Sequence, residues 1–352
     1  MKRICVIPQV SGVGGMVSFR DRFIAGLEAR GIEVTHDSRL NTFDSLLVIG
    51  GTRDIPGLWR ARRRGVRIVQ RLNGMNWLHR LQRTGTGLKH FLRAEYGNLI
   101  LRTIRARLAN HIVYQSEFAH QWWERTYGPT PVPYSVIHNA VDLNTYTPTP
   151  KSTIQISPIY KLPVDHFRLL LVEGSLMGGY ELGLESAVQL IELLNTRYLD
   201  RLGKPAGLLV AGRVLDEVKA QWAQKTNIPL IWAGLVPHEQ IPALDRSAHL
   251  LYSSDINAAC PNSVIEALAC GLPVLAFDTG ALPELVTGNA GRVVPYGGDP
   301  WQLESPDIPA LAEAAIEILT QQTNFRTAAR TRAEEAFELD LMLDRYLQAL
   351  KG

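Results

Sequence analysis

The feature that most constrains the fold of this 352-residue chain is an alternation of short apolar runs with longer amphipathic runs, which occurs twice. The first series ends near Asp142, where the sequence NTYTPTPKSTIQISPIYKLP is rich in proline, threonine and serine, and the second series begins after it. Apolar runs that alternate with helical patterns favour parallel strands covered by helices on both faces. The sequence therefore predicts an α/β fold with two successive doubly wound parallel-sheet domains.

The domain boundaries expected from this pattern are an N-terminal domain over 1–150, a linker over 151–166 and a C-terminal domain over 167–326. Residues 327–352 predict one long amphipathic helix that would pack on either domain, including back on the N-terminal one. Strands are expected at 3–8, 45–49, 67–71, 111–114, 168–173, 206–211, 230–233, 249–253 and 273–277, and helices at 17–30, 88–109, 182–198, 216–226, 263–269 and 308–321.

Charge is distributed unevenly between the two halves. Residues 1–150 carry 21 Lys and Arg against 10 Asp and Glu, whereas residues 151–352 carry 16 against 24. The excess is concentrated between Arg53 and Arg107, where 14 basic residues accompany only Asp54 and Glu95 and aromatic residues are interleaved. This tract predicts either a solvated arginine-rich face or peripheral contact with an anionic membrane or acceptor. No nucleic-acid-binding motif accompanies it, so a nucleic-acid partner is not expected.

The cysteine count and the absence of long apolar runs indicate the cellular compartment in which the protein is expected. Cys5, Cys260 and Cys270 provide no disulfide framework. The N-terminus lacks the apolar stretch of about 7–15 residues found in signal peptides, and no run approaches the roughly 18 apolar residues of a membrane span. We therefore expect a cytoplasmic protein, including one peripheral to the inner face of the membrane. The histidines and acids show no metal-ligand spacing, so neither a metal nor a cofactor is expected.

A glycine-rich segment, SGVGG at 11–15, follows the first expected strand. Backbone N–H groups in such a turn at the start of a helix can bind a diphosphate. A tight turn that binds nothing would also use glycine, and both interpretations remain open from the spacing alone.

The segment at 253–274, SSDINAACPNSVIEALACGLPV, contains most of the motif residues. It predicts a strand, a loop, a helix that begins near Ser263 and ends at Gly271, and a further strand. Glu266 interrupts an otherwise apolar helix and needs a partner if it is buried. That partner would be a ligand in a functional site, or a helix cap or an arginine in a purely structural role.

This segment resembles the donor-site signature of the family 4 glycosyltransferases. These are retaining enzymes of the GT-B fold, in which two Rossmann-like domains face a cleft, and they use nucleotide-diphosphate sugars. Further matches occur in the family's order, namely QSEF at 115–118, IHNAVD at 137–142, Tyr146 with Pro148, GLV at 234–236 and DTGALPE at 278–284.

The resemblance implies hexosyl transfer from a nucleotide-diphosphate sugar to a glycan or lipid-linked acceptor, as in polysaccharide biosynthesis, with the nucleotide sugar as co-substrate. It implies that the N-terminal domain binds the acceptor and that the C-terminal domain binds the donor. In this family the glutamate at the position of Glu266 binds the ribose. The other implied donor-binding positions are Gly14, Gly15, Ser175, Val236, Asn262, Ser263, Val264 and Gly280, and Asn73 takes the catalytic position on the acceptor side. Arg213, which follows an expected strand, is the candidate cation of the donor site.

The sequence departs from the family pattern at three donor-site positions. The family's first glutamate is Ala258, with Asp255 and Asn257 nearby but out of register, and its arginine and lysine are Ser175 and Tyr180. Loss of these groups removes stabilisation of developing phosphate charge. Two alternatives therefore accompany the transferase, namely a catalytically silent scaffold or regulator and a sugar-nucleotide epimerase of the same fold.

Overall fold

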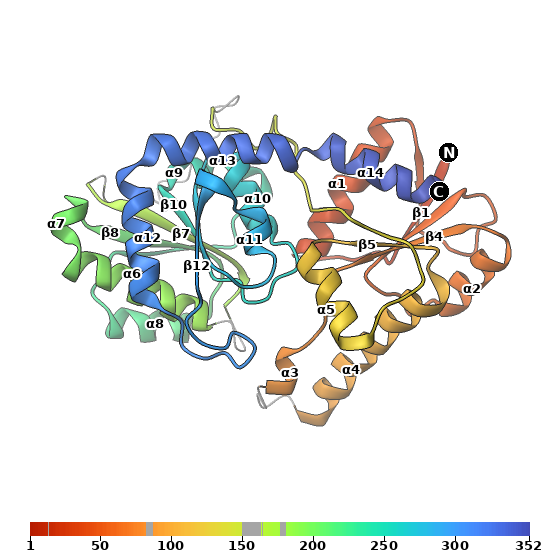
Figure 1. Ribbon diagram of the computed structural model, residues 1–352, viewed down its shortest axis with the longest axis horizontal. Helices are drawn as coiled ribbons and strands as arrows, with labels where there is room; N and C mark the ends of the chain where they lie inside the picture. Colours follow the sequence, from red (N-terminus) through yellow and green to blue (C-terminus); the bar gives the residue numbers. More distant parts are fainter. Residues whose placement is uncertain (13, 82–86, 150–162, 164, 177–180) are drawn as a thin grey trace. The chain divides into compact units, whose positions relative to one another are not determined.

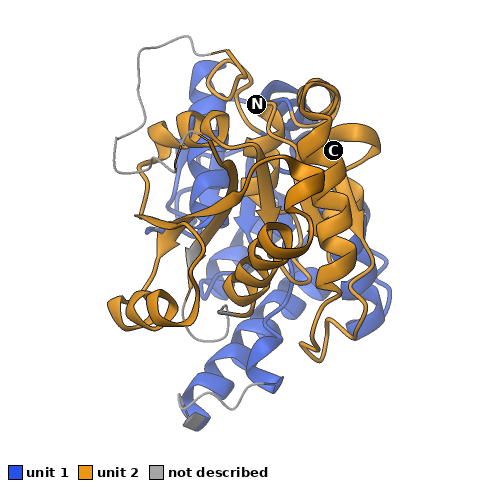
Figure 2. Ribbon diagram, turned by 90° about the vertical axis from the view of Figure 1, so that its left-hand side faces the viewer, with its two compact units in different colours: residues 1–140, 338–352 blue, residues 141–337 orange. Residues whose placement is uncertain are grey.

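The computed structural model describes the chain except for residues 13, 82–86, 150–162, 164 and 177–180 (Figure 1). Two compact units make up the described part, one of residues 1–140 with 338–352 and the other of residues 141–337 (Figure 2). The division falls at Ala140–Val141 instead of the expected residue 150. The expected linker at 151–166 lies mostly outside the described residues.

Unit 1 is built on a six-stranded, fully parallel sheet with the strand order β2-β1-β3-β4-β5-β6. Its strands are β1 Arg3–Ile7, β2 Glu33–Thr35, β3 Ser45–Ile49, β4 Arg67–Leu72, β5 His111–Tyr114 and β6 Tyr134–Val136. Its helices are α1 Gly15–Ala29, α2 Ile55–Arg63, α3 Leu78–Leu81, α4 Gly87–Thr103 with a π-helical continuation Ile104–Leu108, α5 Glu117–Tyr127 and α14 Leu339–Lys351.

Helices cover both faces of this sheet. On one face, Phe19 and Phe23 of α1 pack with Leu343 and Tyr346 of α14. On the other, α2 and the π-helical continuation of α4 share a second apolar cluster that includes Leu58. Burial on both faces explains why β3 and β5 are largely apolar runs that the sequence could reveal.

Unit 2 repeats the plan with the strand order β12-β11-β10-β7-β8-β9, again fully parallel. Its strands are β7 Phe167–Ser175, β8 Ala206–Arg213, β9 Leu230–Gly234, β10 Leu250–Ser253, β11 Val274–Phe277 and β12 Gly291–Val294. Its helices are α6 Glu181–Arg197, α7 Leu199–Leu202, α8 Asp216–Lys225, α9 Ile241–Ser247, α10 Asn262–Ala269, α11 Leu282–Leu285, α12 Ile308–Thr320 and α13 Gln322–Ala336.

Each sheet contains one point at which the strand order reverses. In unit 1 the chain continues from β1 to β2 on one side and then returns to β3 on the other. In unit 2 it continues from β7 to β8 and β9 and then returns to β10. Doubly wound sheets bind ligands beside the carboxyl ends of the two strands that flank such a switch point.

The C-terminal segment differs from its expectation of one continuous helix. The helix α13 ends at Ala336, and α14 begins at Leu339 after an extended Glu338. The two helices belong to different units, and α14 lies in unit 1, where Arg30 forms ion pairs of 2.8 and 2.7 Å with Asp340 and Asp344. The break was not expected because both helices are amphipathic, so the apolar pattern continues through it.

Three short strands, β2, β6 and β12, were not expected from the sequence, and each lies at the edge of its sheet. Their residues are largely half-buried or exposed, so they lack the apolar runs of the central strands. Within the described ranges, no helix is both long enough and apolar enough to cross a membrane.

Candidate functional site

The carboxyl edge of the unit 2 sheet brings several predicted residues together, because its strands are parallel. Ser175 ends β7, and Arg213 ends the adjacent β8 as its backbone partner. The N–H of Leu176 donates to the carbonyl oxygen of Arg213 at 2.9 Å, while the Arg213 side chain is exposed. Val236 follows β9, farther from the switch point. Tyr180, at the position of the family's lysine, lies outside the described residues.

The helix α10 begins at the same edge, after Pro261 in extended conformation. Asn262, Ser263 and Val264 form its first turn, in which backbone N–H groups have no acceptor within the helix. Glu266 lies one turn farther on and is only 7% exposed. The helix ends before Gly271, which has a φ of 69°, as the sequence predicts.

The Gly280 turn follows β11 and packs directly on the loop before α10. Gly280 has a φ of 60°, and a Cβ at this position would lie 2.5 Å from the carbonyl oxygen of Ala258. The N–H of Ala281 donates to that same oxygen at 2.9 Å. The turn therefore requires glycine, and it fixes the backbone at Ala258, where the family pattern has a glutamate.

Two acids meet at the switch point of unit 2. Glu173 belongs to β7, and Asp255 follows β10, which is the neighbouring strand. The Ser254 hydroxyl hydrogen-bonds Glu173 Oε1, and the Thr279 hydroxyl donates to the carbonyl oxygen of Asp255 at 3.0 Å. Desolvation, followed by the charge of Asp255, raises the pKa of Glu173 to about 8. Desolvation also raises the pKa of Asp255 to about 6, so the two carboxylates share a proton near neutral pH.

Sequence analysis did not assign a role to Glu173. The available signal was a carboxylate inside an apolar strand, the same kind of signal that identified Glu266. Its partner was not apparent because β7 and β10 are far apart in the chain. Asp255 was considered only as a substitute for the family's first glutamate, with which it is out of register.

A third acid, Asp245 on α9, lies behind α10. It is buried, and desolvation followed by the charge of Glu266 raises its pKa well above the ordinary value. The Cys270 side chain, also buried, interacts with it and lowers its pKa in part. Burial and the neighbouring Glu266 therefore both favour the protonated form of Asp245.

The predicted residues of unit 1 also gather at the carboxyl edge of their own sheet. Gly14 has a φ of 144° and precedes α1, and a Cβ there would meet nothing within 4 Å, so the backbone of this turn adjoins open space. Gly15 is the first residue of α1. A Cβ at Gly50 would lie 3.6 Å from Met16 Sδ and 3.9 Å from Asn73 Oδ1, which places Asn73 near the start of α1. The Trp123 indole N–H donates to the carbonyl oxygen of Asn73 at 2.7 Å.

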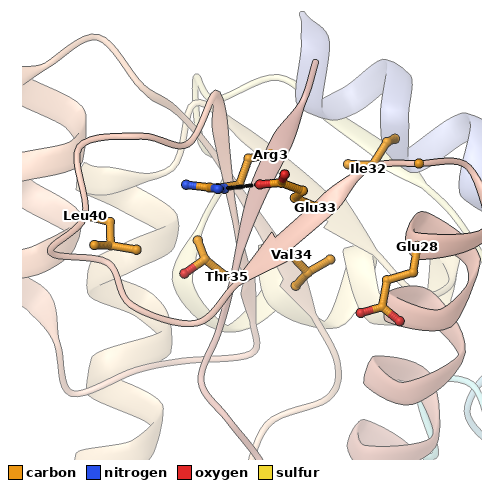
Figure 3. A pocket seen from close by; sticks show the side chains of 8 residues that line it. Arg3, Glu28, Ile32, Glu33, Val34, Thr35 and Leu40 are labelled. Atoms are coloured by element: carbon orange, nitrogen blue, oxygen red, sulfur yellow. Dashed lines mark hydrogen bonds and ion pairs between the residues drawn. The ribbon is translucent and has the colours of Figure 1, made fainter.

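A pocket of about 630 Å³ lies elsewhere in unit 1, beside the edge strand β2 (Figure 3). Arg3 and Glu33 form an ion pair within it, and Glu28, from the last turn of α1, lines one side. None of the predicted site residues is among its lining residues. Since α1 starts at the carboxyl edge and runs back across the sheet, this pocket lies toward the opposite edge.

Some arginines of the basic tract at 53–107 are buried within unit 1, whereas others face solvent. Arg71 is buried, donates to Asn139 Oδ1 at 2.8 Å and lies 3.8 Å from the centre of the Phe19 ring. Arg105 is buried too and donates to the Tyr114 hydroxyl at 2.9 Å. Four more side chains of the tract bind acceptors within unit 1, namely Arg62 at Leu108 O, Arg64 at Leu40 O, Arg67 at Ala349 O and Arg80 at Glu95. The tract is therefore only partly the solvated face that its composition predicts.

The acid pair leads to a prediction about stability. The unfolded chain ionises Glu173 near 4.5, whereas the folded chain retains the proton up to about pH 8. The contribution of Glu173 to stability is therefore fully present below pH 4.5, declines through this window and is lost as the pH rises through about 8. Glu173→Gln should remove a decline of up to about 1.4 kcal/mol per pH unit, measured by chemical denaturation across the window. An unchanged pH dependence in the variant would show that another group titrates.

Comparison with known proteins places this edge within a family. The family described as "Glycosyl transferases group 1" matches residues 169–321, which contain β7, α10 and the Gly280 turn. This match covers less than half of the chain. The predicted glycosyltransferase class is thereby confirmed for this part of the chain, while the finer assignment to family 4 is consistent with the match.

A relative with a curated name matches a shorter segment of the chain. It is the GDP-mannose-dependent monoacylated alpha-(1-6)-phosphatidylinositol monomannoside mannosyltransferase of Corynebacterium glutamicum, 32% identical over 91 residues. The matched segment is 25% of this chain and 22% of the relative, so the chain spans about a fifth of the length of that relative.

Solved structures similar to the whole chain establish the fold. Sucrose-phosphate synthase from Thermosynechococcus elongatus superposes with a TM-score of 0.72 at 15% identity, covering 100% of this chain and 98% of that one. HepE of Anabaena, solved with UDP and glucose, gives a TM-score of 0.68 at 17% identity and covers 100% of both chains. Together with the two parallel sheets, these similarities confirm the predicted two-domain GT-B fold.

Proposed function

We propose that the protein is a glycosyltransferase that moves a hexosyl unit from a nucleotide-diphosphate sugar to a glycan or lipid-linked acceptor with retention of configuration. The observation that carries the proposal is α10, whose first turn opens at the switch-point edge of unit 2 with a buried Glu266 one turn behind it. A helix N-terminus favours a diphosphate, and a carboxylate can accept hydrogen bonds from two ribose hydroxyls.

Similar proteins support each half of this proposal. HepE was solved in complex with UDP-glucose, and the Corynebacterium relative is named as GDP-mannose-dependent. Both compounds are nucleotide-diphosphate hexoses, which supports such a donor. The name of that relative also includes a phosphatidylinositol mannoside, which supports a lipid-linked acceptor. The nucleotide sugar enters as co-substrate, and no separate cofactor or metal is part of the proposal.

The charges at the edge suggest how a diphosphate is accommodated without the family's arginine and lysine. A proton shared by Glu173 and Asp255 removes one negative charge from the switch point, and the exposed Arg213 ends the strand next to β7. We assign the diphosphate to the N–H groups of Asn262, Ser263 and Val264 and to the Gly280 turn, with Arg213 as the cation and Ser175 and Val236 at the margins. In unit 1, the resemblance implies a donor-binding role for Gly14 and Gly15 and an acceptor-side role for Asn73.

The test is a screen of nucleotides and nucleotide sugars against the full-length chain, scored both by thermal stabilisation and by hydrolysis of the sugar. A ligand present at 100 times its dissociation constant should add about 2.7 kcal/mol to the free energy of unfolding. Stabilisation with slow hydrolysis supports the transferase, and the anomeric configuration of the released sugar tests retention.

Two outcomes of the same screen would replace the proposal. If no nucleotide or nucleotide sugar stabilises the protein, the chain is a catalytically silent member of the fold that acts as a scaffold or regulator. If a nucleotide sugar is converted to its epimer in the absence of acceptor, the chain is an epimerase. A contact of residues 53–107 with an anionic membrane or acceptor also belongs to the proposal, because part of that tract remains exposed.

A further inference from the structure

The helix α4 of unit 1 carries a row of large apolar side chains that face solvent. They follow one another at intervals of four, four and three residues, so they lie on one side of the helix. Their exposed fractions are 73% for Leu88, 57% for Leu92, 51% for Tyr96 and 55% for Leu99. We call these four residues the α4 stripe. At about 1.5 Å per residue, the stripe is roughly 16 Å long.

The helix is held by its other side, so the exposure of the stripe does not result from a detached segment. Asn98 is buried and receives a hydrogen bond from the N–H of Asn76 at 3.0 Å, while Ile100 packs against the apolar cluster beneath α2. The carbonyl oxygen of Leu101 accepts from the Gln70 side chain of β4 at 3.2 Å. One side of α4 thus packs within unit 1, and the stripe lies on a side that faces solvent.

The charges beside the stripe are positive. Lys89, Arg93 and Arg102 on α4 are exposed. The single acid of α4, Glu95, is paired with Arg80 of α3 through contacts of 2.7 and 3.0 Å, and its hydrogen bond with Arg80 lowers the pKa of Glu95 to about 2. The Arg80–Glu95 pair is therefore neutral over the ordinary pH range, which leaves the three cations of α4 uncompensated within the helix.

A second element on the same face of the sheet has a similar surface. Trp59 of α2 is exposed, and the guanidinium group of Arg63 lies 4.1 Å from the centre of its ring. The helix α2 packs against the π-helical continuation of α4 in one apolar cluster, so both helices cover this face. An indole beneath a cation is a common arrangement at membrane interfaces, where the ring lies at headgroup depth.

We propose that α4 is an interfacial helix that docks unit 1 on an anionic lipid bilayer. The α4 stripe would enter the boundary between headgroups and acyl chains, and Lys89, Arg93 and Arg102 would lie at the level of the lipid phosphates. A helix with an apolar face flanked by cations binds a bilayer by apolar burial and by electrostatic attraction together. Monomeric proteins rarely expose a contiguous apolar surface without such a partner.

The occupant is assigned as a bilayer for two reasons. The stripe lies on the convex surface of one helix, which suits a flat and deformable apolar phase. Its flanking charges are of one sign, which complements anionic headgroups and opposes the approach of a second copy of the same basic surface. The inference deepens the proposed contact with an anionic membrane and rests on it, but vesicle binding can be measured without any sugar donor, so it can fail separately from glycosyl transfer.

The test is co-sedimentation of the full chain with vesicles of phosphatidylcholine alone and of phosphatidylcholine mixed with phosphatidylglycerol. We expect binding to the anionic vesicles, a decrease with added salt and little binding to phosphatidylcholine alone. Leu92→Ser combined with Leu99→Ser leaves the charge unchanged and should reduce the partition coefficient at least tenfold. Leu199→Ser on α7, another exposed helical leucine, should bind as the wild type does.

Two double variants, each lacking two positive charges, measure the electrostatic contribution to vesicle binding. Lys89→Gln with Arg93→Gln should reduce binding to anionic vesicles several-fold, whereas Lys225→Gln with Lys351→Gln, which removes two exposed charges elsewhere, should change it less. Circular dichroism checks that each variant is folded, and Leu88→Ser, the most exposed position, replaces the double variant if that one unfolds. Wild-type binding by the Leu92/Leu99 variant would overturn the proposal, as would no binding by the wild type. A wild-type dimer that these serines dissociate, without vesicle binding, would identify a protein interface instead.

Discussion

Glu266→Ala is expected to weaken nucleotide binding about 5- to 150-fold, the equivalent of about 1–3 kcal/mol for the loss of a charge-assisted hydrogen bond. The reason is its position, because Glu266 is buried one turn into a helix whose first N–H groups open at the switch-point edge of unit 2. Isothermal titration with the nucleotide selected by the donor screen measures the change. Glu313→Ala, an exposed carboxylate on α12 paired with Arg201, removes the same charge from the same unit and should leave the affinity unchanged.

The structural alternative for Glu266 gives a different result. If Glu266 serves only to pack α10 against α9, its removal will change the free energy of unfolding and the titration of Asp245 but not the affinity for nucleotide. Glu266→Gln distinguishes the two further, because it keeps the shape of the side chain and one acceptor oxygen. Unchanged affinity in both Glu266 variants would refute the assignment to the ribose.

Gly280→Ala is expected to destabilise unit 2 by more than about 2 kcal/mol, as a combination of left-handed backbone strain and a backbone clash. The φ of 60° costs a side-chain-bearing residue about 1–2 kcal/mol. The new Cβ would also lie 2.5 and 2.6 Å from the oxygen and nitrogen of Ala258, and these backbone atoms cannot move without displacing the loop before α10.

Gly288 offers a matched control for this substitution. Its φ is 59°, almost the same, but a Cβ there would meet nothing within 4 Å. Gly288→Ala should therefore show the backbone strain alone, and the difference between the two variants in chemical denaturation measures the clash. Equal losses of stability in Gly280→Ala and Gly288→Ala would mean that the loop at Ala258 moves without cost to accommodate the new Cβ. The Gly280 turn would then have no role in fixing the start of α10.

Much of the fold was predictable because its signals are local. A strand such as β3 is five consecutive buried residues, and the longer helices have apolar faces that repeat with the helical period. The edge strand β2 was missed because its side chains are only partly buried. The break before Glu338 was missed because α13 and α14 are both amphipathic. Their apolar patterns do not indicate which sheet each helix covers.

The candidate site was predictable in its positions and much less in its electrostatics. Placement of Ser175, Arg213 and Gly280 at one edge follows from parallel strands, whose carboxyl ends coincide. The pairing of Glu173 with Asp255 required the knowledge that β10 returns to the other side of β7. The desolvation of Glu173 and Asp255 and the coupling of their charges depend on which strands are neighbours in the sheet. A short segment of sequence does not show which strands are neighbours.

The sequence by itself determined the two α/β units, the order of the motifs and the residues that reach the carboxyl edge of unit 2, because hydrophobic periodicity and turn chemistry act over a few residues. Only the tertiary structure decided that burial beside Asp255 raises the pKa of Glu173, that α14 joins unit 1 and that Arg71 and Arg105 are internal. It also decided that the α4 stripe stays uncovered within unit 1. These outcomes depend on burial and on the dielectric environment, which are set by contacts between segments far apart in the chain.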